Sequence, residues 1–144
     1  MNNSRVDSDR VVLAATLLTG FIGLACYAVL YLTVMQYGQL NTSGRAFSWL
    51  ALILTAATLL MSIYLALAAR SRALASSALS GVGWFIVAAG LVLAFPALGG
   101  TIGLLHAQGL STFNGVAGAL FLIMAGAGLL QAERTAREHS ADNA

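Results

Sequence analysis

The stretch FSWLALILTAATLLMSIYLALAA, from Phe47 to Ala69, is mostly apolar and carries no charged side chain. About 20 such residues in a helix span the hydrocarbon core of a bilayer. Three other stretches of the chain have the same length and character. The sequence therefore predicts four membrane-spanning helices, at about residues 11–35, 47–69, 76–95 and 110–132.

The composition of the whole chain agrees with lipid as its solvent. The 144 residues are 59% hydrophobic and only 8% charged, whereas a soluble domain carries about 25% charged residues. We therefore expect an all-α fold, a four-helix transmembrane bundle that occupies residues 11–132. Short polar tails, residues 1–10 and 133–144, flank it.

The arginines predict the orientation of this bundle. If the four spans run up and down in turn, six arginines fall on one side of the membrane and one on the other; the six are Arg5, Arg10, Arg70, Arg72, Arg134 and Arg137, and the seventh is Arg45. Basic residues resist translocation across the membrane. We therefore predict an up-down topology in the plasma membrane with both termini in the cytoplasm.

Small and hydroxyl-bearing residues recur along each span at alternating steps of three and four. Membrane helices associate where such residues let two backbones approach and where hydroxyls bond across the gap. We predict a packing stripe on each helix that includes Thr16, Thr19, Gly23, Thr55, Thr58, Ser62, Gly83, Gly90, Gly115 and Gly118. Because such residues are abundant in this chain, the interpretation we favour is ordinary helix packing. A solute path lined by the threonines is the alternative.

The chain lacks the residues that several classes of protein function require. Coupled transporters and proton relays keep an ionisable group within the membrane, and no predicted span has one. We place all the acidic residues in solvated tails, away from any serine that could act as a nucleophile: Asp7, Asp9, Glu133, Glu138 and Asp142. Cys26 is the only cysteine, so an internal disulfide and a CxxC zinc or redox pair are excluded. The arginines are too dispersed for nucleic-acid binding. We expect no enzymatic activity.

The connection between the third and fourth spans, AFPALGGTIGLLHAQG at Ala94–Gly109, is apolar although it contains turn-forming residues. Since proline disfavours helix in the residue before it, we expect the third span to end at Phe95. Irregular backbone at this depth must lie at the interface, dip between helices or be covered by a partner. We predict that it contacts lipid or a partner through Pro96, Gly99, Gly100, Gly103, Leu104, Leu105 and His106.

The two histidines, His106 and His139, fall on opposite sides of the predicted membrane. A bis-histidine haem needs both ligands at similar depth, so the chain cannot hold one alone. Sharing a haem with another subunit through His106 is a weaker alternative than a polar residue at the interface. We expect no cofactor, although bound lipid is compatible with the sequence. Asn41-Thr42-Ser43 matches a glycosylation sequon, but we favour a simple polar turn.

Two hypotheses for function remain. The first is a non-catalytic structural, accessory or assembly subunit of a larger membrane complex, whose partners are the lipid bilayer and other membrane proteins or further copies of the chain. The alternative is a homo-oligomeric transporter or channel for a neutral or apolar solute, with Thr55, Thr58 and Ser62 or the third connection lining the path.

Overall fold

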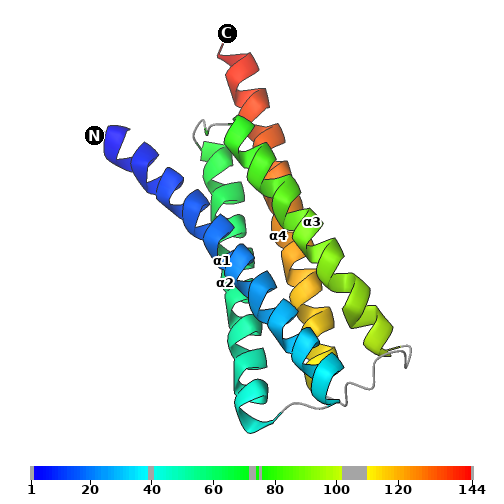
Figure 1. Ribbon diagram of the computed structural model, residues 1–144. Helices are drawn as coiled ribbons and strands as arrows, with labels where there is room; N and C mark the ends of the chain where they lie inside the picture. The colour runs from blue at the N-terminus through cyan, green and yellow to red at the C-terminus, as the bar shows by residue number, and fades with distance from the viewer. Residues whose placement is uncertain (1, 39–40, 72–73, 75, 102–109, 144) are drawn as a thin grey trace.

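The computed structural model describes residues 2–38, 41–71, 74, 76–101 and 110–143, and these residues form four helices and no strand (Figure 1). The helices are α1 (Asn2–Tyr37), α2 (Thr42–Ser71), α3 (Ser76–Thr101) and α4 (Leu110–Asp142). All four are long and apolar enough to cross a membrane. The prediction of an all-helical protein with four candidate membrane spans is therefore confirmed, and these spans indicate a multi-pass membrane protein.

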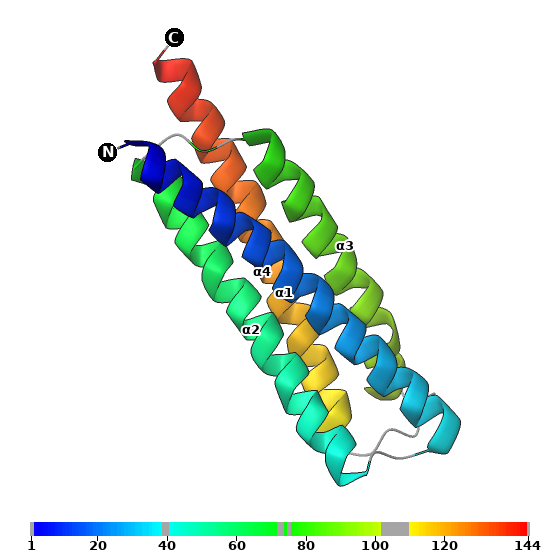
Figure 2. The same cartoon turned by 60° about the vertical axis from the view of Figure 1, so that its left-hand side comes forward.

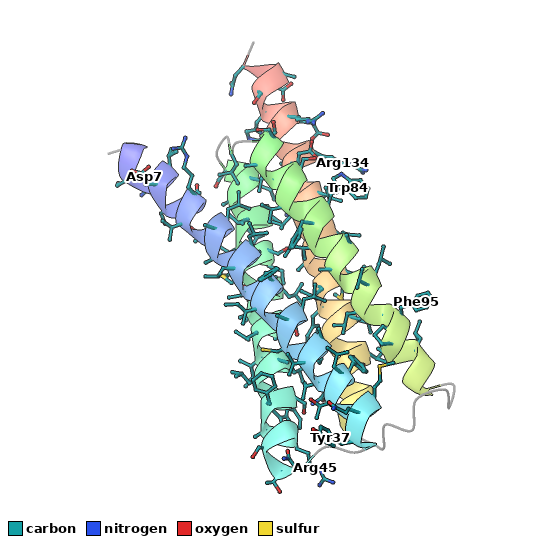
Figure 3. All side chains as sticks on the ribbon, viewed as in Figure 1. Asp7, Tyr37, Arg45, Trp84, Phe95 and Arg134 are labelled. Atoms are coloured by element: carbon teal, nitrogen blue, oxygen red, sulfur yellow. The ribbon has the colours of Figure 1, made fainter. Side chains whose placement is uncertain are left out.

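The helices form an elongated bundle in which α4 packs against α2 and α3, and α1 packs against the same two helices (Figures 1 and 2). The N-terminal end of α1 and the C-terminal end of α4 lie at the same end of this bundle. Toward that end, α1 inclines away from α3 in Figure 1. Asp7 and Arg134 lie near the end with the termini and Arg45 near the opposite end (Figure 3).

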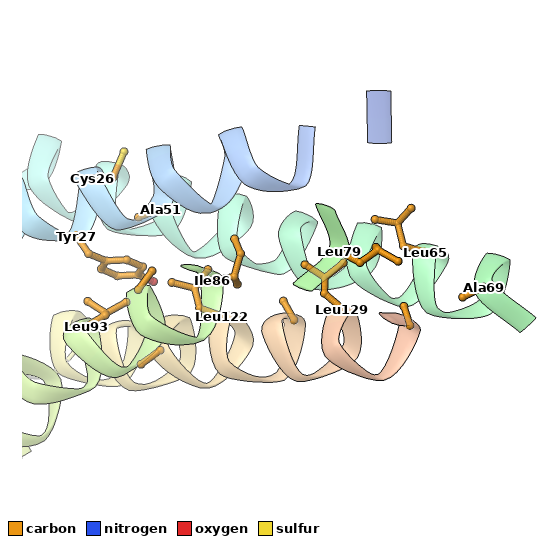
Figure 4. Packing of buried hydrophobic residues seen from close by; sticks show 14 of the residues in the cluster. Cys26, Tyr27, Ala51, Leu65, Ala69, Leu79, Ile86, Leu93, Leu122 and Leu129 are labelled. Atoms are coloured by element: carbon orange, nitrogen blue, oxygen red, sulfur yellow. The ribbon is translucent and has the colours of Figure 1, made fainter. Parts of the chain in front are cut away.

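The interior is filled by a few large side chains set among small ones (Figure 4). Tyr27, Ile86, Leu122 and Leu129 are almost completely buried, with alanines such as Ala125 between them. Many large apolar side chains point outward instead, and Phe95 is 86% exposed. An apolar exterior around a tightly packed interior is what a helix bundle in lipid requires, since lipid rather than water contacts the outer face.

Local signals set the ends of the helices at the first connection. Gly38 adopts a left-handed backbone conformation, with φ of 76°, and its N–H bonds the carbonyl of Val34 at 2.8 Å. This arrangement is a C-terminal cap that glycine accepts without strain. Helix α2 begins directly after Asn41, whose side-chain oxygen accepts the N–H of Gly44 at 2.7 Å. The polar turn that we favoured for Asn41 thus includes the N-terminal cap of α2.

The expectation that the third span ends at Phe95 was wrong as a statement about the helix. Helix α3 continues through Pro96 to Thr101. Ending the helix at Phe95 would leave several backbone groups without partners at membrane depth, whereas continuing it loses only the bond that proline cannot make. Packing also favours continuation, because Ala97 is fully buried and its Cβ lies 3.5 Å from where a methyl group on Gly115 of α4 would sit.

The expectation that the acidic residues lie in solvated tails was wrong for two of them. Asp9 is only 5% exposed and Glu133 only 8%. Helix α1 begins at Asn2 and α4 extends to Asp142, so both residues lie on helices that pack in the bundle. Glu133 is paired with Arg137, one turn later, at 2.5 Å. This ion pair is the i,i+4 pair that helical spacing allows, and it offsets part of the cost of burying the carboxylate.

Candidate functional site

Hydroxyl side chains of α1 and α2 lie along the inside of the bundle and bond to neighbouring helices. Thr19 of α1 and Thr58 of α2 share a hydrogen bond of 2.9 Å, and Ser62 of α2 donates to the carbonyl of Ala125 in α4 at 2.6 Å. Each of these bonds joins two helices. Hydrogen bonds between membrane helices are worth about 0.6 kcal/mol on average, so this set aligns α2 with its neighbours more than it stabilises the whole fold.

Threonines of the proposed stripe also bond to the carbonyls of their own helices. Thr16 donates to the carbonyl of Val12, and Thr55 and Thr58 donate to those of Leu52 and Leu54. Thr16, Thr55, Thr58 and Ser62 are all 0% exposed. Their hydroxyls therefore have partners within the protein and do not face an open path.

Glycines bring α3 and α4 into backbone contact. A methyl group on Gly90 of α3 would lie 2.9 Å from the backbone nitrogen of Ile123. One on Gly126 of α4 would lie 2.8 Å from the carbonyl oxygen of Gly83. Real Cβ atoms essentially never come within 3.0 Å of another heavy atom. This close approach depends on glycine, and Gly126 is a contact residue that the sequence interpretation did not include.

The other glycines of the proposed stripe lie against larger side chains. Gly23 faces Thr55, while Gly115 and Gly118 of α4 face the tyrosines of α1. A methyl group on Gly118 would lie 2.5 Å from the ring and hydroxyl of Tyr27. One on Gly115 would meet the hydroxyl of Tyr31. The two glycines therefore make room for aromatic side chains that reach from α1 to α4.

Those tyrosines belong to a buried polar cluster, which we define as Tyr27, Tyr31, Ser48 and Asn114. Tyr27 donates its hydroxyl to the backbone carbonyl of Asn114 at 2.8 Å, and the amide of Asn114 donates to Ser48 at 3.2 Å. The Asn114 side-chain oxygen and the Tyr31 hydroxyl are buried and have no hydrogen-bond partner. The cluster joins α1, α2 and α4 and leaves one acceptor and one hydroxyl unsatisfied.

Sequence reasoning missed this cluster because it considered charges and repeating small residues. One signal was present: Asn114 is the only asparagine in the four predicted spans. An amide in a membrane helix is costly unless it bonds to another helix, so its presence indicates an interhelical contact.

A lateral groove opens on the lipid-facing side of the bundle between α1 and α3. It has a volume of about 740 Å³ and is almost entirely apolar. The rings of Phe21 and Phe85 stack at one point along it, with centroids 6.5 Å apart and planes at 29°. We call this feature the α1–α3 groove, lined by Ala14, Leu17, Leu18, Phe21, Gly81, Val82 and Phe85.

The predicted contact stretch around His106 is described only in part. Pro96 lies half-buried within α3, and Gly99 and Gly100 belong to the last turns of the same helix. The other four residues of the prediction lie outside the described residues; they are Gly103, Leu104, Leu105 and His106. The contact proposed for this stretch remains a prediction.

Among the described residues, no three or more His, Cys, Asp or Glu side chains are grouped so that they could hold a metal ion. Comparison with known proteins adds no family assignment to this geometry. No protein-family model, no curated protein sequence and no solved structure matches the chain.

Proposed function

We propose that this chain is a non-catalytic accessory subunit of a larger membrane complex, and that a transmembrane helix of its partner packs in the α1–α3 groove. The observation that carries the proposal is the groove itself, because it is an apolar depression on a face that would otherwise contact lipid. In a bilayer, lipid chains or a further helix can fill such a depression, and membrane helices associate where small residues let two backbones approach.

Two small residues that line the groove favour a helix as its occupant. Ala14 and Gly81 are small and exposed, and a methyl group on Gly81 would meet nothing within 4 Å. The other lining residues, including Phe21 and Phe85, are larger. A small-residue notch between larger apolar neighbours lets a second backbone approach closely, which is how membrane helices associate.

The alternative, transport of a neutral solute, receives less support. One of its two possible paths relies on the hydroxyls of Thr55, Thr58 and Ser62, which are 0% exposed and hydrogen-bonded to backbone carbonyls. The other path, along the third connection, lies largely outside the described residues. A hydroxyl that already donates its hydrogen to a backbone carbonyl cannot donate it to a solute. We therefore place the function at the outer surface of the bundle.

We also propose the location and topology. The four spans run up and down through the plasma membrane, with both termini in the cytoplasm. In an up-down order of spans the sequence assigns six arginines to one side and Arg45 to the other, and Arg134 and Arg45 lie near opposite ends of the bundle (Figure 3). This asymmetry supports the orientation, since basic residues remain on the cytoplasmic side.

The test is affinity purification in mild detergent of the wild-type protein and two tryptophan variants. Gly81→Trp places a large side chain in the groove, and its Cβ fits without a clash because nothing lies within 4 Å of that position. Leu60→Trp is the matched control, on an exposed face of α2 away from the groove. We expect a second membrane protein to accompany the wild type and Leu60→Trp and to be lost from Gly81→Trp.

Two results would contradict the proposal. One is that the wild type is recovered as a lone monomer, or only with further copies of itself. The other is that Gly81→Trp retains the second protein as well as Leu60→Trp does.

A further inference from the structure

A second, smaller cavity lies beside α1 and α3, nearer the end of the bundle that carries the two termini. Its volume is about 380 Å³. Most of its wall is apolar, and α2 contributes one residue; the lining residues are Val6, Asp9, Arg10, Leu13, Leu65, Leu74, Ala78 and Leu79. On α1, Leu13 of this cavity directly precedes Ala14 of the α1–α3 groove.

The residues that line the cavity and the groove follow one face of α1 and one face of α3. On each helix they recur at steps of three and four; they are Arg10, Ala14, Leu17 and Phe21 on α1, and Ala78, Val82 and Phe85 on α3. Residues at this spacing lie on the same face of a helix. The cavity therefore continues the groove. We call the two together the extended groove, and from Arg10 to Phe21 it is about 16 Å long, given the rise of an α-helix.

Arg10 brings a positive charge to one end of the extended groove. Its side chain is exposed, and it forms no ion pair with another of the described residues. Asp9 also lines the cavity, but it is only 5% exposed and already has an interaction within the protein. Of the described residues that line the extended groove, only Arg10 therefore offers an open charge.

A helix that fills the extended groove would cover this arginine. Arg10 directly precedes the first apolar stretch, which begins at Val11, so the covering helix would reach the edge of the membrane there. Covering a charged side chain removes water from it, and this is costly unless an opposite charge pairs with it. The helix that fits the groove is therefore one that brings a negative charge to Arg10.

We propose that the partner's transmembrane helix carries an aspartate or a glutamate that pairs with Arg10. The guanidinium donates a pair of hydrogen bonds to the carboxylate, the geometry for which arginine is suited. The acidic residue lies at the same end of its span as Arg10, about three turns from the part of the partner that faces Phe21. This inference rests on the accessory function proposed above and adds the charge that the partner must carry.

The first test uses a reaction that needs a lysine, which the chain lacks. Arg10→Lys introduces a single lysine amine, and a carbodiimide joins it to a carboxylate in direct contact. An amide forms, and the carbodiimide takes up the water that is lost. We expect the purified complex to give an adduct whose crosslinked peptide contains an aspartate or glutamate at the end of an apolar span. Arg5→Lys is the matched control and should give none, since Arg5 is exposed on the same helix but does not line the cavity.

The second test reverses the charge. In Arg10→Glu two carboxylates would face each other, and like charges brought together at an interface oppose association strongly. We expect recovery of the second protein in mild detergent to fall about tenfold or more, and Arg5→Glu to retain it. Protection of the buried Cys26 from a maleimide shows that each variant is folded.

The outcomes separate this inference from the accessory function. Loss of the partner from Gly81→Trp with full retention by a folded Arg10→Glu would overturn the inference alone. Amide adducts to lipid only, or to Asp9 of the same chain only, would also overturn it, because no carboxylate of the partner then contacts residue 10. If no second membrane protein accompanies the wild type, both proposals fail.

Discussion

Replacing Gly126 with alanine tests the contact between α3 and α4. The added methyl group would meet Val87 Cγ2 and would lie 2.8 Å from both the Gly83 carbonyl oxygen and the Val87 backbone nitrogen. The Val87 side chain can rotate away, but the two backbone atoms cannot. The two helices must therefore move apart to accommodate the methyl group. Gly81→Ala on α3 is the matched control, because nothing lies within 4 Å of its new methyl group.

The expected free-energy change is the balance of two effects. In a helix interior, replacing glycine with alanine gains up to about 1 kcal/mol. Overpacking a tight contact costs about 1–3 kcal/mol, and a radial gap of about 0.5–1 Å loses a quarter to a half of the dispersion energy of each contact it opens. We therefore expect Gly126→Ala to lower the free energy of unfolding by about 1–2 kcal/mol. Gly81→Ala should leave it unchanged or raise it by up to about 1 kcal/mol.

The native Cys26 provides the assay. It is the only cysteine in the chain and is buried, at 8% exposure. Its labelling by a maleimide during titration from mild detergent into dodecyl sulfate therefore reports unfolding. The midpoint should shift to lower dodecyl sulfate in Gly126→Ala and remain in place or rise in Gly81→Ala. A Gly126→Ala midpoint at or above that of the wild type would refute the reasoning, as would equal losses in both variants.

Two further predictions concern the polar cluster and the topology. Tyr27→Phe should lower the free energy of unfolding by about 1 kcal/mol, because the Tyr27 hydroxyl bonds the carbonyl of Asn114; Tyr31→Phe should leave it unchanged or raise it, since the Tyr31 hydroxyl is buried without a partner. The same labelling titration measures both, and a larger loss in Tyr31→Phe would contradict this account of the cluster. For the topology, a membrane-impermeant maleimide added to intact cells should label Ser43→Cys but should label Asp142→Cys only after permeabilisation. The reverse pattern would show the opposite orientation.

The number of helices could be predicted from the sequence because the property that decides it is local. Each span is a continuous apolar run such as 47–69, and such runs in lipid must satisfy their own backbone hydrogen bonds. The neighbours of each helix could not be predicted, because small residues occur on every span. Gly118 and Gly126 each lie between two alanines, and only the structure shows that the first faces Tyr27 while the second faces the backbone of α3.

The wrong expectations about the end of α3 and about two acidic residues have the same physical cause. In both cases the packing of the helices against one another outweighed a rule based on the local sequence alone. Proline usually ends a helix, yet α3 continues past Pro96 because its last turns pack on α4 through Ala97. Charged residues usually lie in solvent, yet Asp9 and Glu133 are buried where α1 and α4 extend beyond the apolar runs. The groove and the cavity depend on how α1 inclines relative to α3, which no pattern along a single helix encodes.

The most direct test of the proposed function is site-specific photo-crosslinking in native membranes. A benzophenone amino acid placed at Gly81 lies in the α1–α3 groove, whereas one placed at Leu60 lies on an exposed face outside it. We predict a discrete protein adduct of defined mass from position 81 and none from position 60. Lipid adducts alone at both positions, or the same protein adducts at both, would contradict it.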